Sequence, residues 1–418
     1  MLFSGTAKDT FILFAGNVGT AFWAFLFTLF VARSLSVYDF GIFSAALNLV
    51  AILSSIADIG ISTGSVNFVS THTALGEHER ANQYIKASFI IRLLVVLGIS
   101  VVVLIFAPFV SNAFLATRDP KIAIWSAIIP IFLFPDLFFP YILQAKKKFL
   151  HSTIIDNAFY LARLLVALAF YTIGGLTMSK AFWAFGAGFV ASLMFIFIYF
   201  KPDFLKSHPG KEEYKKLIKF SGWIAVNRII SSVSGKLDVT MLAALVGALA
   251  TGLYSIPSRL ASFIIILAGS FSSVLAPRLA GFGDRESEKK YIIKSTLALL
   301  PITAGIIVWI IFAKPFILTL FGAKYIESVP IFQALALAQI PFLFTVPSVS
   351  AIIYSMKKTV YIGAYSFFQI AAIFVLNFFL IPKYGVFGPT MTLGATNIIL
   401  AVYTWGIVIK HYWGRNND

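Results

Sequence analysis

Nine charged side chains interrupt long apolar stretches of this chain. The densest group lies in NRIISSVSGKLDV, residues 227–239. The cations in such stretches are Arg92, Arg163, Arg228, Lys236 and Arg259, and the acids are Asp58, Asp136, Asp156 and Asp238. Guanidinium and ammonium groups suit phosphate or another anion, and guanidinium can bind phosphate oxygens through two hydrogen bonds. Five cations against four acids favour, by a small margin, an anionic ligand over a cationic one.

The segment 227–239 is amphipathic when it is wound as a helix at about 100° per residue. One side carries Asn227, Ser231, Ser234 and Asp238, with Arg228, Ser232, Gly235 and Lys236 on the adjoining arc. Ile229, Ile230, Val233, Leu237 and Met241 gather on the opposite side. One face of this helix can therefore meet lipid, while the other must meet protein or water.

The composition excludes an ordinary soluble domain. The chain has 418 residues, of which 59% are hydrophobic and 12% charged, with a mean hydropathy of +0.89. A soluble domain would carry about 25% charged residues. The sequence therefore predicts an all-α polytopic membrane protein, with helices preferred over a barrel because the apolar runs are continuous. Cysteine is absent, which excludes disulfides and thiolate chemistry.

Twelve apolar runs have about the length of 20 residues that a helix needs to cross the hydrocarbon layer. They are expected at 10–33, 40–68, 85–109, 121–144, 152–174, 180–200, 218–246, 251–276, 291–313, 327–354, 360–381 and 387–410. On this scheme Arg228 lies about 15 Å into its span and Lys236 about 27 Å, at ~1.5 Å per residue. A charge at mid-membrane costs at least ~2.5–3.5 kcal/mol, so a wet cavity or an ion pair is expected there.

Basic residues set the expected orientation and explain most of the charge. If the N-terminus is cytoplasmic, the predicted inside loops hold most of the Lys and Arg, including the central loop 201–216. Both termini are therefore expected in the cytoplasm. The formal net charge of +16 then reflects topology, and no nucleic-acid partner is expected.

The central loop divides two similar halves. At an offset of 211 residues, IPIFLF (129–134) aligns with IPFLFT (340–345) and Lys146-Lys147 aligns with Lys357-Lys358. A nearby offset pairs IFAPF (105–109) with IFAKPF (311–316). Because each half has six predicted spans, the halves must share one orientation, as in transporters built from parallel repeats. We expect an N-terminal six-helix lobe at 1–207 and a C-terminal one at 208–418.

No catalytic or metal site is predicted. The chain contains neither a phosphate-binding G-x-x-x-x-G-K-[ST] loop nor an H-E-x-x-H motif. All five histidines fall in or beside predicted inside loops. GISTG, residues 60–64, matches a nucleophile elbow but lacks the strand–turn–helix context, and it fits a close-packing G-x-x-x-G face better. Pro130, Pro135 and Pro140 predict an irregular or kinked helix around Asp136.

Three further stretches resemble a known family. ARSLSVYDFGIF (32–43), LQAKKKF (143–149) and YGVFGP (384–389), together with the twelve spans, are similar to the polysaccharide-transporter family of the multidrug/oligosaccharidyl-lipid/polysaccharide exporter superfamily. Within it, the Wzx-type O-antigen flippases are the most similar. The resemblance covers essentially the full length of the chain.

The resemblance implies a MATE-like, V-shaped transporter of two lobes that works by alternating access in the bacterial inner membrane. The implied cargo is an oligosaccharide on polyprenyl pyrophosphate, moved from the cytoplasmic to the outer leaflet. The family's lumen is cationic, which suits Arg163, Arg228, Lys236 and Arg259, with Arg92 near one end of its span. No cofactor is implied, but proton or sodium coupling is, for which the four acids are candidates. We expect a monomer, with other polysaccharide-assembly membrane proteins as further partners.

Three alternatives stay open on the residues alone. The intramembrane charges could form structural ion pairs that hold helices together, with no transport role. A multidrug or cation antiporter of the same fold would favour a more acidic lumen. A membrane-embedded polysaccharide polymerase or ligase would need larger outside loops than this chain provides.

Overall fold

The computed structural model describes residues 2–200 and 202–414, except for the side chains of residues 2–7, 223 and 227. All regular elements in these residues are helices, as expected for an all-α protein. Ten helical stretches of the described chain are long and apolar enough to cross a membrane. One of them, Thr359–Trp413, contains two consecutive helices joined by a short turn. The chain is therefore a multi-pass membrane protein.

The contacts between residues group the chain into two compact units, Met1–Lys236 and Leu237–Asp418. This division falls after the helix that follows the central loop, whereas the repeat predicted a boundary between residues 207 and 208. The boundary between residues 207 and 208 therefore stays a prediction. Lys201, in the predicted central loop, lies outside the described residues.

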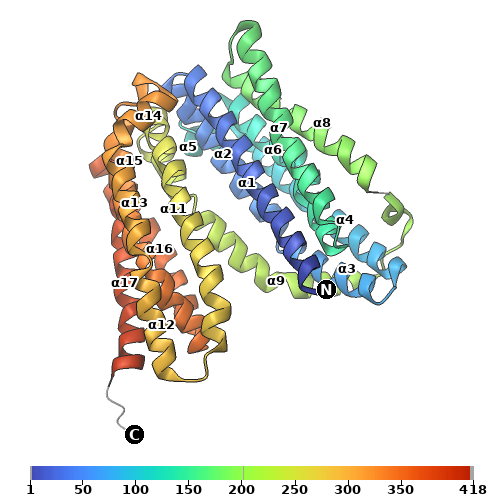
Figure 1. The fold of residues 1–418 in the computed structure, drawn as a ribbon. Helices are drawn as coiled ribbons and strands as arrows, with labels where there is room; N and C mark the ends of the chain where they lie inside the picture. The colour runs from blue at the N-terminus through green and yellow to red at the C-terminus, as the bar shows by residue number, and fades with distance from the viewer. Residues whose placement is uncertain (1, 201, 415–418) are drawn as a thin grey trace. The chain divides into compact units, whose positions relative to one another are not determined.

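The first unit is built around one proline-containing helix. Its elements are α1 (Leu2–Ser34), α2 (Val37–Asp58), α3 (Ile61–Ala74), α4 (His78–Ile105), α5 (Ala107–Phe114), α6 (Pro120–Ala145), α7 (Phe149–Gly174), α8 (Met178–Tyr199), η1 (Pro202–Lys206) and α9 (Lys211–Ser234). Helix α6 contacts α2, α3, α4, α7 and α8, while α1 lies along α7 (Figure 1). Buried Phe134, Phe138 and Phe139 of α6 form the centre of its apolar core.

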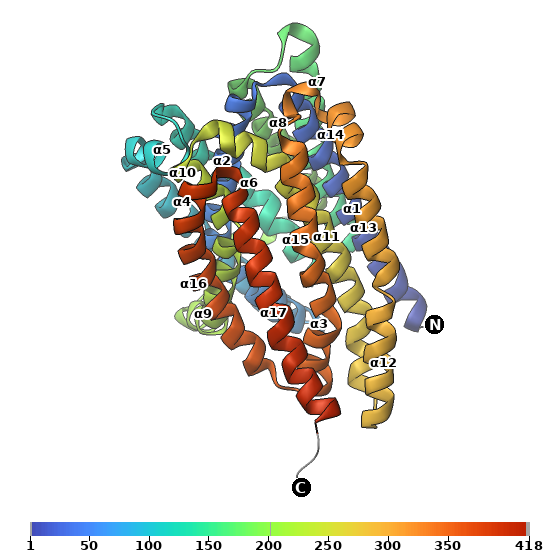
Figure 2. The same cartoon turned by 90° about the vertical axis from the view of Figure 1, so that its left-hand side faces the viewer.

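The second unit consists of α10 (Leu237–Leu245), α11 (Ala248–Gly281), α12 (Arg285–Leu297), α13 (Leu300–Ile311), α14 (Ala313–Phe321), η2 (Ala323–Tyr325), α15 (Ser328–Ser350), the π-helical turn η3 (Ala351–Ser355), α16 (Thr359–Tyr384), η4 (Gly385–Phe387) and α17 (Gly388–Trp413). Helix α15 lies between α11 and α17 and contacts both along their length (Figure 2). It occupies the place in this unit that α6 occupies in the first.

The order of helices in the first half recurs in the second. Helix α2 begins at Val37 and α11 at Ala248, 211 residues later, whereas α7 and α16 begin at Phe149 and Thr359, 210 residues apart. The short helices α5 and α14 both follow a phenylalanine, Phe106 or Phe312, with nearly the same backbone angles. The sequence match between IFAPF and IFAKPF therefore marks two equivalent helix breaks.

The lysine pairs mark equivalent turns as well. Lys147 and Lys357 both have left-handed backbones, with φ of 57° and 56°. In the first turn Lys148 N–H donates to the Leu143 carbonyl, five residues earlier, and in the second Lys358 N–H donates to the Ile352 carbonyl, six residues earlier. The second turn closes over one extra residue because the π-helical turn η3 precedes it.

Four predicted spans are interrupted where the sequence pattern indicated continuous helices, and one of them, 85–109, breaks at Phe106 between α4 and α5. The span 40–68 breaks between α2 and α3, at Ile59 and Gly60, whose φ values are 38° and 67°. The span 218–246 breaks at Gly235 and Lys236, and the span 291–313 breaks just before Pro301. Glycine and proline weaken a helix locally, whereas hydropathy averages over a whole window and does not detect such breaks.

The three prolines of α6 do not end the helix, and the kink expected around Asp136 stays a prediction. Pro120–Ala145 is one continuous α-helix that contains Pro130, Pro135 and Pro140. Neighbouring side chains donate to its carbonyls, because Ser100 Oγ lies 2.7 Å from the Ala127 oxygen and Arg92 Nη1 lies 2.7 Å from the Leu137 oxygen. Such bonds offset the loss of amide donors at proline.

Candidate functional site

A left-handed turn places a carboxylate at the start of α3. Asp58 is the last residue of α2, and Ile59 and Gly60 reverse the chain direction so that α3 begins at Ile61. The Asp58 carboxylate accepts hydrogen bonds from the backbone N–H of Ser62, at 3.2 Å, and from the Ser62 hydroxyl. The negative charge thus lies at a helix N-terminus, where unpaired amide groups stabilise it.

Gly60 is required at this turn for a second reason. A Cβ at Gly60 would lie 2.8 Å from the Ser221 carbonyl oxygen and 3.0 Å from Ile224 Cβ, both on α9. A Cβ at Gly64 would lie 2.6 Å from the Ser221 hydroxyl. The GISTG segment is therefore a close-packing surface for α9, as the sequence predicted. The close approach of α9 brings Arg228 to Asp58.

Two arginines share the Asp58 carboxylate. Arg92 Nη1, on α4, lies 3.2 Å from Asp58 Oδ1, and Arg228 Nη1, on α9, lies 2.5 Å from Asp58 Oδ2. Arg92 also donates to the Ser62 hydroxyl at 2.7 Å. Arg92, predicted as a lumen cation near one end of its span, has a side chain that is only 4% exposed. It contributes to a buried network because a buried guanidinium needs a counter-ion and hydrogen-bond acceptors.

This trio leaves one positive charge in excess. One carboxylate faces two guanidinium groups, and Arg228 is the more accessible of the two, with 41% of its side chain exposed. Arg228 Nη2 donates to the Thr63 hydroxyl at 3.2 Å, so its orientation is fixed from two sides. The charges of Asp58 and Arg92 offset each other, so the positive charge of Arg228 remains. An oriented, partly exposed guanidinium of this kind is suited to bind the oxygens of a phosphate.

Lys236 lies in the break between α9 and α10, and Asp238 lies in the first turn of α10. The carbonyl of Lys236 accepts a hydrogen bond from the side-chain amide of Asn48, at 3.0 Å. Asp238 accepts from the Tyr254 hydroxyl at 2.9 Å and from the Val239 N–H at 2.7 Å. Although Arg228 and Asp238 are close in sequence, the described partners of Arg228 lie in the first unit and those of Asp238 in the second.

Arg163 is surrounded by aromatic rings. Its guanidinium carbon lies 4.3 Å from the centre of the Phe27 ring, 4.6 Å from Phe185, 4.9 Å from Tyr160 and 5.7 Å from Phe159. Arg163 as a whole is 7% exposed. Rings stacked around a guanidinium stabilise its charge through their negatively polarised faces. The enclosure keeps Arg163 within the packing of α1, α7 and α8.

Asp136 and Asp156 form an acidic group near Arg163. Asp136, on α6, is 4% exposed and accepts a hydrogen bond from the Ser192 hydroxyl of α8 at 3.3 Å. It lies within electrostatic reach of Asp156 and Arg163, both on α7. Arg259 differs from these residues because it is exposed on α11. The predicted site residues thus separate into the Asp58 trio, the Arg163 group and three further positions, Lys236, Asp238 and Arg259.

Sequence reasoning missed a neutral polar seam in the second unit. Asn397 of α17 donates to the Ala338 carbonyl at 2.9 Å and to Gln339 Oε1 at 3.4 Å, both on α15. Further along, Ser348 donates to the Thr404 hydroxyl at 2.8 Å. The signal that could have revealed it is the recurrence of threonine and asparagine on α17, at residues 390, 392, 396, 397 and 404.

Comparison with known proteins shows the family of this chain. A family model described as "Polysaccharide biosynthesis protein" matches residues 6–283. The chain belongs to this family. Its relatives include the "Putative O-antigen transporter" of Shigella flexneri, 24% identical over 87% of this chain and 88% of that protein. The "Uncharacterized membrane protein EpsK" of Bacillus subtilis is 26% identical over 77% of this chain and 67% of that protein.

Solved transporters share the fold. An inward-facing multidrug resistance MATE family transporter of the MOP superfamily superposes with a TM-score of 0.78 at 14% identity, covering 95% of this chain and 96% of that one. The lipid II flippase MurJ, in an inward closed conformation, superposes with a TM-score of 0.75 at 16% identity, covering 97% and 89%. This polysaccharide biosynthesis protein therefore has the fold of these two transporters.

Proposed function

We propose that this protein is a flippase for oligosaccharides carried on polyprenyl pyrophosphate. The observation that carries the proposal is the Asp58 trio, in which Arg228 remains 41% exposed while its charge is oriented by Asp58 and Thr63. A pyrophosphate needs a cation of fixed direction inside the membrane, and an oriented guanidinium provides two donors to it. The relationship to an O-antigen transporter supports the same class of cargo.

In this proposal the chain forms twelve spans in two six-helix lobes that alternate between inward and outward openings. The repeated order of helices and the MATE-like fold support this arrangement. The head group of the cargo moves from the cytoplasmic to the outer leaflet of the bacterial inner membrane. Both termini lie in the cytoplasm, the protein works as a monomer, and a proton or sodium gradient drives the exchange.

The cations have different roles in this mechanism. Arg228 binds the pyrophosphate, with Lys236 and the exposed Arg259 as further contacts for the anion. Arg92 and Arg163 hold helices together, because their side chains are enclosed by protein groups. Asp58 orients Arg228, while Asp136, Asp156 and Asp238 are the candidates for the coupling ion.

Complementation tests this assignment. In a strain that lacks the protein and therefore its surface polysaccharide, we expect the wild-type gene to restore the polymer and Arg228→Gln to restore little of it at equal protein abundance. Arg228→Lys keeps the charge but loses the forked donors, so it should restore an intermediate amount. Arg118→Gln, which removes an exposed loop arginine, is the matched control and should behave as wild type. Full restoration by Arg228→Gln would reject Arg228 as the anion site.

A multidrug antiporter is the second candidate, because the fold is shared with a MATE family transporter at a TM-score of 0.78. It predicts that loss of the protein increases sensitivity to cationic drugs and leaves surface polysaccharide intact. The flippase proposal predicts the reverse. The two phenotypes can be measured in the same deletion strain.

A further inference from the structure

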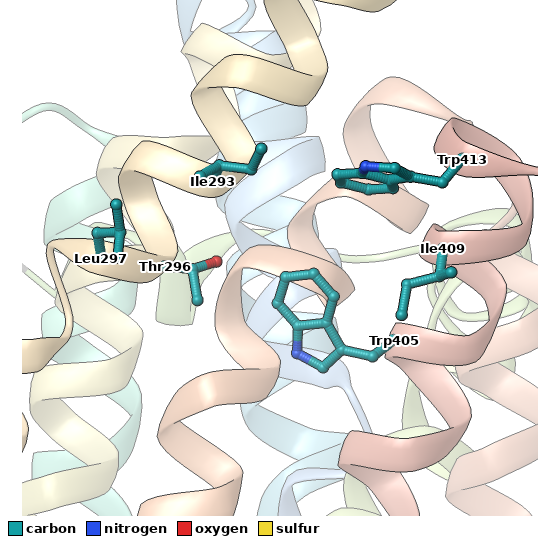
Figure 3. A pocket seen from close by; sticks show the side chains of 6 residues that line it. All are labelled: Ile293, Thr296, Leu297, Trp405, Ile409 and Trp413. Atoms are coloured by element: carbon teal, nitrogen blue, oxygen red, sulfur yellow. The ribbon is translucent and has the colours of Figure 1, made fainter.

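An apolar groove runs between α12 and α17 in the second unit. It has a volume of about 450 Å³ and is lined by Ile293, Thr296, Leu297, Trp405, Ile409 and Trp413 (Figure 3). The residues on α17 recur every four positions, so they form one stripe along that helix. Between Trp405 and Trp413 this stripe is about 12 Å long, at ~1.5 Å per residue.

The shape and lining of the groove suit a hydrocarbon chain. Two polar side chains of its lining are bonded within the protein, because Trp405 Nε1 donates to the Phe344 carbonyl at 2.9 Å and Thr296 Oγ1 to the Ile292 carbonyl at 2.8 Å. The volume would hold roughly fifteen groups of the size of a water molecule, at ~30 Å³ each. That is comparable to one acyl chain, and no polar partner is needed along its length.

One end of the groove is basic. Lys289 lies one turn before Ile293 on α12, and its ammonium is 4.7 Å from the centre of the Trp413 ring. Lys410 lies three residues before Trp413 on α17, which places the two side chains as neighbours on the helix surface. Neither lysine is in an ion pair within the described part of the chain. A phosphate at this end would meet two ammonium groups.

The nearby acids are engaged elsewhere. Glu286 lies 3.6 Å from Lys290, one turn further along α12. Glu288 accepts a hydrogen bond from the Tyr412 hydroxyl at 2.6 Å, and Asp284 accepts from the Ser287 N–H at 2.7 Å. These contacts hold the carboxylates on fixed partners. None of these acids forms an ion pair with Lys289 or Lys410 in the described part of the chain, so both ammonium groups can contact an external anion.

We propose that this groove binds one acidic phospholipid of the surrounding bilayer, with an acyl chain along the tryptophan stripe and the phosphate at Lys289 and Lys410. The lipid bridges α12 and α17, which the Tyr412–Glu288 hydrogen bond joins at their ends. The site is separate from the Asp58 trio and requires only that the protein lies in a bilayer.

Tryptophan fluorescence can test the proposal, because Trp405 and Trp413 line the groove. The full-length protein is reconstituted in phosphatidylcholine vesicles with a fixed mole fraction of dibrominated phosphatidylglycerol or dibrominated phosphatidylcholine. Bromine quenches a tryptophan on contact. We expect the acidic lipid to be preferred at the groove by about five-fold per lysine, with a preference that weakens as salt is added. The double variant W405F/W413F should lose this preferential quenching and leaves the other five of the seven tryptophans as background.

The lysine variants decide whether the phosphate is recognised. Lys289→Gln should reduce the preference about five-fold. Lys314→Gln, which removes an exposed lysine on α14, is the control and should leave it unchanged. Equal quenching by the two brominated lipids, or a preference that Lys289→Gln leaves undiminished, would overturn the proposal.

Competition separates the bilayer lipid from a cargo-like lipid. Unlabelled phosphatidylglycerol should relieve the quenching at least as well as polyprenyl phosphate at the same mole fraction. If polyprenyl phosphate relieves it much better, the groove binds prenyl lipid and the proposal of a phospholipid site is wrong. Since this measurement does not depend on transport, a failure here leaves the complementation result for Arg228 unaffected.

Discussion

The two units bury different kinds of polar group. The first unit buries ionisable side chains, with Asp58, Arg92, Asp136 and Arg163 each at most 7% exposed. In the described part of the second unit, the buried polar side chains are neutral, and Asn397, Gln339 and Thr404 are typical of them. The order of helices is nevertheless the same in both halves. A repeated architecture therefore does not require a repeated pattern of charge.

The difference follows from what each kind of group needs when it is buried. An ionised side chain loses several kcal/mol of hydration and must have a counter-ion and several hydrogen bonds. An amide or hydroxyl loses less and can be satisfied by a nearby carbonyl. The first unit has to orient an arginine, whereas the seam in the second unit has only to join α15 to α17. Substitutions in the two units test this contrast.

Asp58→Asn should cause the largest loss of stability. The change leaves Arg92 and Arg228 close together without a counter-ion, and breaking a buried pair typically costs ~3–5 kcal/mol. The free energy of unfolding in detergent measures the effect. Arg92→Gln removes one of the two cations instead and leaves the Asp58–Arg228 pair intact, so it should cost less. If Asp58→Asn lowered the free energy of unfolding by less than Asn397→Ala does, the contrast between the buried charges of the first unit and the neutral seam of the second would be wrong.

Gly60→Ala should be the next most damaging change. The left-handed backbone costs alanine ~1–2 kcal/mol. In addition, the new methyl group would lie 2.8 Å from the Ser221 carbonyl, so α9 must move away and Arg228 with it. Gly76→Ala, at φ 76° with nothing within 4 Å, is the matched control and should show backbone strain only. Thermal unfolding of the two variants should rank them in this order, and equal costs would show that packing against α9 contributes nothing.

Asn397→Ala should have a moderate effect. It removes the bonds to Ala338 and Gln339 from the neutral seam, and an unsatisfied buried partner costs ~1–3 kcal/mol. The same unfolding measurement applies. We expect surface polysaccharide to persist wherever the protein is still folded, because no charge near Arg228 changes. Loss of transport with normal stability would show that the neutral seam also handles cargo.

The smallest effects should appear at low pH, at equivalent positions of the two units. The His72 hydrogen bond lowers the pKa of Glu77 below its ordinary value of 4.5, and bonds from Ser287 lower the pKa of Asp284 below 3.8. Glu77 and Asp284 directly precede α4 and α12. Each lowered pKa stabilises the fold above the ordinary value, and the benefit disappears as pH falls through the lowered one. Glu77→Gln and Asp284→Asn should therefore lose stability near neutral pH and approach wild type in acid. If the difference in stability between each variant and the wild type stayed constant with pH, this assignment would be wrong.

Much of the fold could be predicted from the sequence, because hydropathy and helix length are local properties. The ends of α7 and α8 lie within a few residues of the predicted spans 152–174 and 180–200. The breaks at Gly60 and Gly235 could not be predicted, since each depends on what packs against the helix. The charged positions were identified, but their partners were not. Arg92 and Arg228 reach Asp58 from 34 and 170 residues away in the chain.

By itself, the sequence determined that the chain spans a membrane, that its halves repeat, and which charges lie among apolar residues. These follow from composition and spacing, because the transfer of each side chain into lipid depends on its type. Only the tertiary structure decided that Arg92 and Arg228 share one carboxylate, that Arg163 is enclosed by rings, and that Asp238 pairs with Tyr254. A buried charge is stabilised by whatever the folded helices bring within a few ångströms of it, and that depends on helix packing rather than on sequence position.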